Sequence, residues 1–326
     1  MKKEDAYENA LLSQFEKLNP SVFTVEYLPA LVFVCGGPCV IDSKNPPVYD
    51  SLRDRIFTYT AAYDDELYSS LVLAENFHDY FKDGAYENLM QFEDDIASVS
   101  TLIIICLESA GSLVELGLFC NKKSLANKLL VFAPSEETES ESSFIFLGPI
   151  SSLQKIDERS VSIYPWPTGD SIKYPHIEHV VGDIKERLRN IKKTERFNIK
   201  NQGHLAILIN EIILLAFPIK IGEIEFALYS MNIDIESKVI SRLLYLLNRL
   251  KLISNKHYSG VSYYYPCDGK KSRVKFGKSS EGKIVEFTDI KVAMRQSFLM
   301  ADILDSDERA RKRRNVLSII DGDRHE

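Results

Sequence analysis

The sequence predicts an α/β protein in which a mainly parallel sheet is followed by a smaller, mostly helical domain. Short apolar runs such as Leu102 to Leu107 do not alternate with polar residues, which is typical of strands buried on both faces. Helical patterns separate these runs, so strand–helix units repeat and helices are expected on both faces of the sheet. From His204 onward, three helical patterns and a hairpin follow instead. The expected domains are therefore residues 1–195 and 196–326.

Composition and charge are those of a globular protein without a membrane segment. A chain of 326 residues can form two cores, and its 45% hydrophobic and 27% charged residues are ordinary values. The N-terminus is too charged for a signal peptide, and no run reaches the roughly 20 apolar residues of a membrane span. The five cysteines contain no second pair at metal-ligand spacing. Reduced thiols, no metal site and a cytoplasmic location are expected.

The charge is distributed unevenly along the chain. The net charge of -7 argues against a protein that coats nucleic acid over its whole surface. Residues 192–275, however, hold fourteen Lys and Arg against seven Asp and Glu, a local balance of +7 that leaves -14 for the remainder. This asymmetry indicates a basic binding module attached to an acidic body.

The first strand is expected at Leu31 to Cys35, and the turn Gly36–Gly37 follows it. A double glycine lets the backbone approach a neighbouring group closely. It indicates either a simple tight turn or a position beside a sugar or phosphate. A helix over 48–62 comes next, and Arg53 within it faces either solvent or a phosphate.

Acidic side chains stand out in the next two segments. Residues 66–77 are expected to form a second strand and a loop that carries Glu75. A helix over 84–98 carries three consecutive acids that begin at Glu93, and such a run is usually a solvated face. Further strands are expected at 129–132 and 161–164, and a helix over 176–193 closes the domain.

The stretch Thr101 to Gly117 combines a buried strand, a loop of small residues and a helix. Ligands of open α/β sheets bind outside the carboxyl ends of the strands, and a helix N-terminus suits a phosphate or a ribose hydroxyl. Ser109, Gly111 and Ser112 leave room for such a ligand. Glu115 is expected in the first helical turn, pointing toward it. The alternative is that Glu115 only complements the helix dipole.

The order S-x-G-S-x-x-E-L-G after an apolar strand resembles the nucleoside 2-deoxyribosyltransferase-like fold, which has a flavodoxin/Rossmann-like sheet. Leu31 to Gly37 (LVFVCGG), Phe144 to Ile150 (FIFLGPI) and the helical C-terminal part extend the likeness. With them the chain resembles the accessory effector proteins, or toxins, of bacterial retrons. The resemblance is most specific between residues 31 and 150 and is loose beyond residue 200.

The resemblance implies an N-glycosidase. The family's catalytic Glu, which attacks or stabilises the anomeric carbon of a ribose, corresponds to Glu115. Glu93 corresponds to the acid that reaches the base or the ribose. The expected substrate-binding residues are Gly36, Gly37, Glu75, Ser109, Gly111 and Ser112.

One position departs from the family pattern and bears on the substrate. In nucleoside-processing members of the wider fold, an Asp commonly stands six residues before the catalytic Glu, and Ser109 has that place here. The departure fits a phosphate-bearing substrate such as NAD better than a plain nucleoside, and no separate cofactor is expected. The implied partners are a retron reverse transcriptase and its msDNA, an RNA–DNA hybrid, which hold the toxin inactive during anti-phage defence. A homo-oligomer or a higher-order complex is expected.

Beyond His204, the helices 205–217, 222–231 and 235–250 and a hairpin over 252–265 have the order of a winged helix-turn-helix. The third helix would be the recognition helix. The residues expected to bind nucleic acid are Lys238, Arg242, Arg249, Lys270, Lys271 and Arg273, with the run Arg309 to Arg314 adding further charge. The alternative is a helical protein-contact domain with solvated lysines.

Three functions are compatible with these patterns. The first is an enzyme that cleaves the N-glycosidic bond of NAD or a related nucleotide, which the S-x-G-S-x-x-E-L-G motif favours. The second is a nucleotide-sensing, DNA-binding regulator without turnover, which fits if Glu115 only caps a helix. The third is a scaffold subunit of an RNA–DNA complex, which would not need the motif. A turnover assay separates the first from the other two.

Overall fold

The structure is a computed structural model that describes residues 5–39, 51–73, 84–138, 143–167, 174–269, 271–305 and 307–323. It divides into two compact units. The sheet unit comprises Tyr27–Lys82 and Asn88–Lys193, and the helical unit comprises Met1–Glu26, Asp83–Glu87 and Thr194–Glu326. The Glu75 and Lys270 positions lie outside the described residues.

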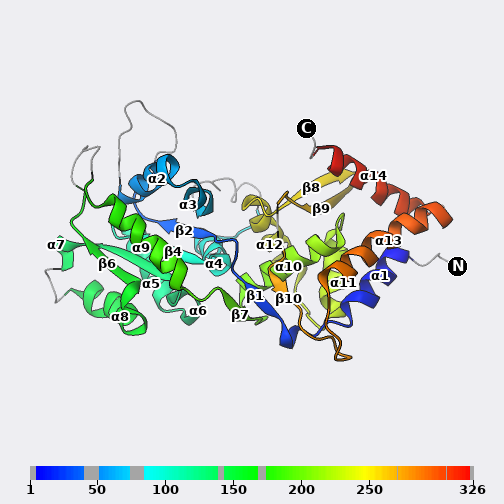
Figure 1. Cartoon of the computed structure of the whole chain (residues 1–326), viewed down its shortest axis with the longest axis horizontal. Coiled ribbons are helices and arrows are strands. Elements are labelled where there is room, and N and C mark those ends of the chain that lie inside the picture. Colours follow the sequence, from blue (N-terminus) through cyan, green and yellow to red (C-terminus); the bar gives the residue numbers. More distant parts are fainter. Residues whose placement is uncertain are drawn as a thin grey trace. The chain divides into compact units, whose positions relative to one another are not determined.

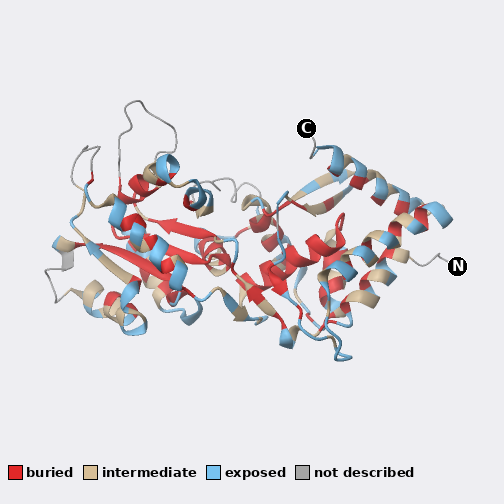
Figure 2. Ribbon diagram, viewed as in Figure 1, coloured by how far each residue is buried: buried red, intermediate tan, exposed pale blue. Residues whose placement is uncertain are grey.

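The sheet unit is built on a five-stranded, entirely parallel sheet with the order β3-β2-β4-β5-β6. Its strands are β2 (Val32–Cys35), β3 (Leu71–Val72), β4 (Leu102–Cys106), β5 (Leu129–Pro134) and β6 (Val161–Tyr164). Counted within the unit, this is the 2-1-3-4-5 order of a doubly wound sheet, whose direction of winding reverses between β2 and β4. Every residue of β2, β4 and β5 is buried, as the unbroken apolar runs predict (Figure 2).

Helices cover both faces of this sheet. The longer ones are α2 (Leu52–Tyr63), α4 (Leu89–Val99), α5 (Ala110–Cys120) and α9 (Ile177–Asn190). Helices α2 and α9, labelled in Figure 1, contact each other. Leu52 of α2 and Ile184 of α9 join one apolar cluster with Val34. Successive strand residues point to opposite faces, so Phe33 points away from this cluster and meets Phe119 of α5 instead. The α4 helix lies beside α6, where Asp94 pairs with Lys122.

Short helices fill the connections of the sheet unit. They are α3 (Asp65–Ser70), α6 (Lys123–Ala126), α7 (Ser135–Thr138), the π-helical turn η3 (Phe146–Ile150), α8 (Ser151–Ile156) and the 3-10 turn η4 (Glu158–Ser160). The second strand, expected within 66–77, is present as the short β3, and the residues before it form α3, which was not expected. The Asp64 carboxylate caps α3 by accepting from the N–H of Leu67. One expectation is corrected here. The helix expected over 84–98 begins only at Leu89, after its N-cap Asn88.

The helical unit contains the expected run of three helices and a hairpin. These are α10 (Gln202–Ala216), α11 (Ile221–Ser230), α12 (Ser237–Arg249), β8 (Ile253–Tyr258) and β9 (Val261–Pro266). The two-residue turn Ser259–Gly260 has positive φ at both positions, which matches the twist of an antiparallel hairpin. The unit also holds η1 (Pro20–Val22), a three-stranded sheet of β10 (Val274–Lys275), β1 (Thr24–Glu26) and β7 (Thr194–Arg196), and the helices α13 (Phe287–Asp305) and α14 (Glu308–Asp323).

The N-terminal residues were expected in the first domain, but they fold with the helical unit. Helix α1 (Ala6–Phe15) buries Tyr7, Leu11 and Phe15 and packs against α11 and α13. Strand β1 pairs with both β7 and β10, so it closes the small sheet of the same unit. The expected division at residues 195 and 196 therefore omitted a segment that returns from the other end of the chain.

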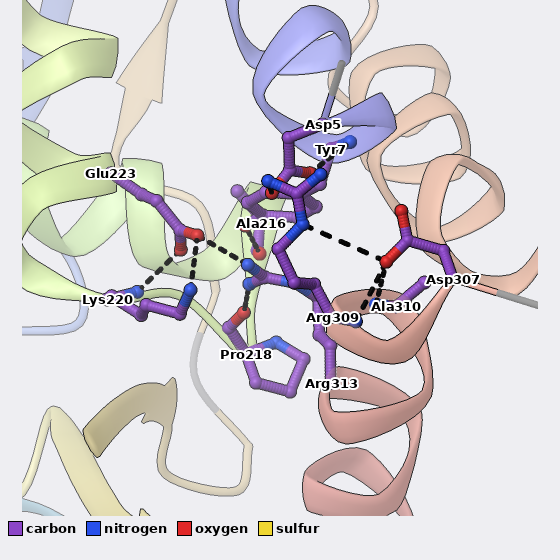
Figure 3. A network of polar contacts seen from close by, with 10 residues as sticks. All are labelled: Asp5, Tyr7, Ala216, Pro218, Lys220, Glu223, Asp307, Arg309, Ala310 and Arg313. Atoms are coloured by element: carbon purple, nitrogen blue, oxygen red, sulfur yellow. Dashed lines mark hydrogen bonds and ion pairs between the residues drawn. The ribbon is translucent and has the colours of Figure 1, made fainter. Parts of the chain in front are cut away.

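A network of polar contacts anchors α14 inside the helical unit (Figure 3). Arg313 is buried, pairs with Glu223 and donates to the carbonyl of Pro218. Its guanidinium lies 3.4 Å from the ring centroid of Tyr7. Arg309 reaches Asp5 and Asp307 nearby. These contacts join both ends of the chain to α11. Among the described residues, no helix is both long and apolar enough to cross a membrane.

Candidate functional site

Two loops meet at the carboxyl edge of the sheet, where the winding direction reverses. Strand β2 ends at Cys35 and continues into Gly36 and Gly37, while β4 ends at Cys106 and continues into Glu108 and the start of α5. The hydroxyl of Ser109 donates to the carbonyl of Gly36 at 3.2 Å, which holds the two loops together. This edge is where ligands of doubly wound sheets bind.

Glu108 organises this edge, although the sequence did not single it out. Its Oε1 accepts from the N–H of Gly37 at 2.8 Å, and its Oε2 accepts from the N–H of Leu52 at 2.7 Å. The N–H of Arg53 donates to Oε1 at 3.2 Å. The carboxylate thus fills the anion site at the N-terminus of α2 from within the protein. A carboxylate directly after a buried strand, followed by a capping serine, is the pattern that could have revealed it.

The double glycine is explained by the same carboxylate. A Cβ on Gly36 would lie 2.8 Å from Oε1 of Glu108, and a Cβ on Gly37 would lie 2.9 Å from Cβ of Ser51. Neither residue has the positive φ that favours glycine, so close approach rather than turn geometry excludes a side chain. Both glycines support the site by admitting Glu108.

Ser109 and Ser112 form a capping box at the start of α5. Ser109 is the N-cap and accepts from the N–H of Ser112, whose hydroxyl in turn accepts from the N–H of Ser109 at 3.1 Å. Ser112 is fully buried, so its hydroxyl serves the helix rather than a sugar. Ser109 is half-buried and Gly111 is exposed. Of the loop residues expected to bind substrate, these two are open to a ligand.

Glu115 was expected in the first turn of the helix, but it is the sixth residue of α5. The first turn of α5 contains no acid. A dipole-complementing role belongs to the first turn, so that alternative loses its geometric basis. The carboxylate is half-buried, and its Oε2 is shielded from solvent. Glu93 of α4 is also buried, with 9% of its surface exposed. This burial excludes the alternative that Glu93 lies on a solvated face of the helix.

Cys35 and Cys106 are buried thiols, and the pKa of each is shifted by nearby charged side chains. Burial raises the pKa of Cys35 well above its usual value, and Glu115 and Glu93 raise it further. Burial raises the pKa of Cys106 likewise, with Glu108 and Glu115 adding to the effect. Arg53 opposes both shifts. Glu93, Glu115 and Arg53 therefore all lie within electrostatic range of Cys35 at the end of β2, and we call these three residues the charged cluster.

The charged cluster has a defined chemical capacity. Both thiols stay protonated at neutral pH because of their raised pKa, so they are poor nucleophiles. Two carboxylates on neighbouring helices can stabilise developing positive charge or form a covalent intermediate. Arg53 is 4% exposed, which rules out the solvated alternative and leaves it as the buried counter-charge of the cluster. Within the parts of the chain that the structure describes, no three His, Cys, Asp or Glu side chains gather to hold a metal ion.

Comparison with known proteins fits this geometry. A family model described as "STM3845 retron effector protein" matches residues 49–255, which include α2, the charged cluster and the three helices that follow. The chain belongs to this retron effector family. Two relatives come from Escherichia coli, and the name of each describes a proposed ribosyltransferase/DNA-binding protein. The one from retron Ec73 is 25% identical over 66% of this chain and 70% of its own length. The one from retron Ec86 is 30% identical over 40% of this chain and 39% of its own length.

The basic residues expected on the third helix of the helical unit lie on α12 but have partners in the protein. Lys238 is exposed and pairs with Glu87. Arg242 is half-buried, donates to Gln202 at 3.3 Å and lies over the ring of Tyr86. Arg249 lies over the ring of Tyr245, 5.1 Å from its centroid. Lys238 is thus the member of this set most open to a phosphate.

Other basic residues serve the fold. Arg273 is 4% exposed, and burial lowers its pKa to about 10, so it does not present a cation to solvent. Lys271 is exposed. The run Arg309 to Arg314, expected to add positive surface, is largely paired with acidic side chains of the same unit. Arg311 and Arg314 both pair with Asp302, Lys312 pairs with Glu308, and Arg313 is buried.

Proposed function

We propose that the sheet unit cleaves the N-glycosidic bond of NAD or a related nucleotide, and that this reaction is the toxic activity of the retron effector. The observation that carries the proposal is that Glu115 and Glu93 both raise the pKa of Cys35, the last residue of β2. Two helices bring a pair of carboxylates to the edge of the sheet where such folds bind ligands. The names of the two relatives, which describe a proposed ribosyltransferase, support the same reaction class.

Glu115 would act at the anomeric carbon. When the bond between C1 of the ribose and the base nitrogen breaks, its electron pair leaves with the base, and positive charge develops on C1 and the ring oxygen. The carboxylate of Glu115 stabilises this charge or bonds to C1. Water then adds to C1 and releases a proton. Nicotinamide leaves NAD as a neutral molecule, so this substrate needs little help from an acid.

Glu93 and the loop residues would position the substrate. Glu93 would orient a ribose hydroxyl or the base, and Ser109 and Gly111 would border the sugar. The wider fold commonly has an Asp at the place of Ser109. An uncharged residue there leaves room for a phosphate that an Asp would repel, which favours NAD over a plain nucleoside.

The helical unit would connect the enzyme to its retron partners. Its order of three helices and a hairpin is that of a winged helix-turn-helix, and residues 192–275 carry a local charge of +7. We propose that Lys238 and Lys271 contact the RNA–DNA product, msDNA, and that this product and the reverse transcriptase restrain the toxin in a higher-order complex. The DNA-binding part of the relatives' names supports this assignment.

The test is a product analysis. The purified protein, alone and together with the reverse transcriptase and msDNA, is incubated with NAD and with a panel of nucleotides and deoxynucleosides, and free bases are separated by chromatography. We expect free nicotinamide or a nucleobase from the protein alone and less from the complex. If no base is released under any condition, the protein is instead a nucleotide-sensing regulator or a scaffold.

A further inference from the structure

The helical unit contains a pocket of its own, and no residue of the charged cluster lines it. Its volume is about 410 Å³, which lies within the range of about 300–1,000 Å³ typical of small-molecule sites. Helix α12 and the hairpin β8–β9 form two of its sides. The segment Gly84–Glu87, which belongs to this unit, contributes Gly84 and Ala85 to the lining.

The side chains that line this pocket are of three kinds. Tyr245 and Tyr264 offer aromatic rings, and Asn248 and Asn255 offer amides that both donate and accept. Lys238 and Arg242 supply positive charge at the same pocket. Rings bind the faces of nucleobases, amides bind their edges, and cations bind phosphate. No acid lines the pocket among the residues that the structure describes, so an anion meets no lining carboxylate there.

The carboxylate of Glu87, which pairs with the pocket residue Lys238, indicates where a phosphate could bind. Glu87 pairs with Lys238, and the pKa of Glu87 is lowered by that hydrogen bond. Both side chains are largely exposed, at 73% for Lys238 and 66% for Glu87, and such pairs contribute little to stability. A phosphate can therefore replace the Glu87 carboxylate. Tyr86, the residue before it, meets Tyr245 edge to face, with centroids 6.1 Å apart.

We propose that this pocket binds one nucleotide, with its base between the tyrosines and asparagines and its 5′-phosphate on Lys238 and Arg242. The occupant is a free nucleoside monophosphate or an unpaired nucleotide of a nucleic-acid strand, since both present the same base and phosphate. The site is separate from the charged cluster and is not needed for glycosidic cleavage. Because Glu87 directly precedes Asn88, the N-cap of α4, an occupant that displaces Glu87 acts at the start of the helix that carries Glu93.

The experiment measures binding rather than turnover, so it does not depend on the proposed enzymatic activity. Isothermal titration uses the full chain with Glu115→Gln, so that the ligands are not consumed. The ligands are ribonucleoside and deoxyribonucleoside 5′-monophosphates, the matching nucleosides, and a short single-stranded oligonucleotide. Three further variants are compared: Ser241→Trp, which fills the pocket, Lys238→Ala, and the control Lys256→Ala. Lys256 has an ion pair with Asp323 outside the pocket.

We expect Lys238→Ala to weaken binding of phosphate-bearing ligands about tenfold without changing nucleoside binding. Ser241→Trp should abolish binding, and Lys256→Ala should leave it unchanged. Binding of monophosphates identifies a free nucleotide as occupant, and binding of the oligonucleotide alone identifies an unpaired nucleotide in a strand.

Absence of binding by all three ligand classes overturns the proposal. So does full binding by Ser241→Trp, or a response of Lys256→Ala equal to that of Lys238→Ala. Melting temperatures show whether each variant is folded. If Ser241→Trp does not fold, Lys238→Ala still provides the test, because Lys238 is exposed and its replacement should not disturb the fold.

Discussion

At the scale of single residues, two acids seven positions apart have different tasks. Both oxygens of Glu108 accept hydrogen bonds from backbone N–H groups, so this carboxylate is fixed by the loops around it. Glu115 lies one and a half helical turns into α5, beside two buried thiols whose pKa it raises. This difference favours the proposed chemical role for Glu115 and a positioning role for Glu108.

Replacing Ser109 by Asp tests whether this residue borders the substrate. Asp is a good N-cap, so α5 should keep its start. The added carboxylate can bind a sugar hydroxyl but repels a nearby phosphate, so the rate on NAD should fall relative to the rate on deoxynucleosides. Ser109→Asn is the matched control, because it also caps the helix but carries no charge. Unchanged relative rates in Ser109→Asp would remove Ser109 from the site.

Glu211 is a buried acid that gives the helical unit a pH-dependent stability. It is fully buried in α10 and accepts from the hydroxyl of Ser272 at 2.6 Å and from the N–H of Arg273 at 2.9 Å. Burial raises its pKa to about 7. The folded state thus holds a proton that the unfolded chain releases near pH 4.5. The contribution of Glu211 to the free energy of unfolding is therefore highest below that pH. It falls by up to about 3 kcal/mol as the pH rises toward 7.

Glu211→Gln should remove this pH dependence. The amide mimics the protonated acid, and its weaker acceptance from Ser272 and Arg273 is the same at every pH. The difference in melting temperature, variant minus wild type, should therefore increase between pH 5 and pH 8. Glu225→Gln, a change in the neighbouring helix α11, is the control. A difference that stays constant across this range would show that Glu211 is ionised throughout.

At the scale of elements, the N-terminus of α2 depends on Glu108. Leu52 and Arg53 donate to a side chain from the end of β4 rather than to a ligand. Glu108→Gln leaves only one carboxamide oxygen for three N–H groups. It should lower the free energy of unfolding by about 1–3 kcal/mol. Denaturant titration measures this, with the exposed Glu66→Gln in α3 as control. Equal stability of the two variants would show that α2 does not need this cap.

Most elements could be predicted from sequence because their patterns are local. The apolar runs of β2, β4 and β5 correspond to buried strands, and the turn Ser259–Gly260 corresponds to the β8–β9 hairpin. The strand expected within 66–77 is present as β3, but the helix α3 before it, which begins after the capping residue Asp64, was not expected. A cap of one hydrogen bond is weaker evidence in a sequence than a run of apolar residues, yet it decides where a helix begins.

The candidate site could be predicted in part. The motif indicated Glu115 and Ser109, but the roles of Glu108, Arg53 and Ser112 depend on contacts between segments that are distant in sequence. Gly37 and Glu108 are 71 positions apart, and no local pattern shows that they meet. The expectation that the basic run Arg309 to Arg314 adds charge for nucleic-acid binding had the same weakness, because a sequence does not show which acids pair with these residues. Its acidic partners, such as Asp302 and Glu223, lie in other helices.

At the scale of the whole molecule, both ends of the chain fold into the helical unit. Tyr7 of α1 and Arg313 of α14 are in contact across more than 300 positions of sequence. The change of pattern along the chain indicated a transition at residues 195 and 196 but could not show that the first 26 residues return to the later unit. The sheet unit is therefore inserted, in sequence, within the helical one.

Salt dependence tests the nucleic-acid role of the helical unit. Lys238→Ala and Lys271→Ala should each weaken capture of msDNA and reduce the slope of log affinity against log salt by about one. Growth of cells that carry the whole retron should suffer as the toxin is freed, while turnover of the purified enzyme stays unchanged. Lys283→Ala, a change at an exposed lysine paired with Glu281, is the control. Wild-type capture at every salt concentration, with healthy cells, would exclude this surface.

The most direct test of the central claim compares two conservative changes in the sheet unit. Glu115→Gln and Glu178→Gln each replace a carboxylate by an amide of the same shape, and Glu178 lies exposed in the first turn of α9. Release of nicotinamide from NAD, and of bases from the nucleotide panel, is measured for both variants and the wild type at equal concentration. We expect Glu115→Gln to be inactive and non-toxic with an unchanged melting temperature, and Glu178→Gln to match the wild type. Wild-type release by Glu115→Gln would contradict the assignment of glycosidic cleavage to this residue.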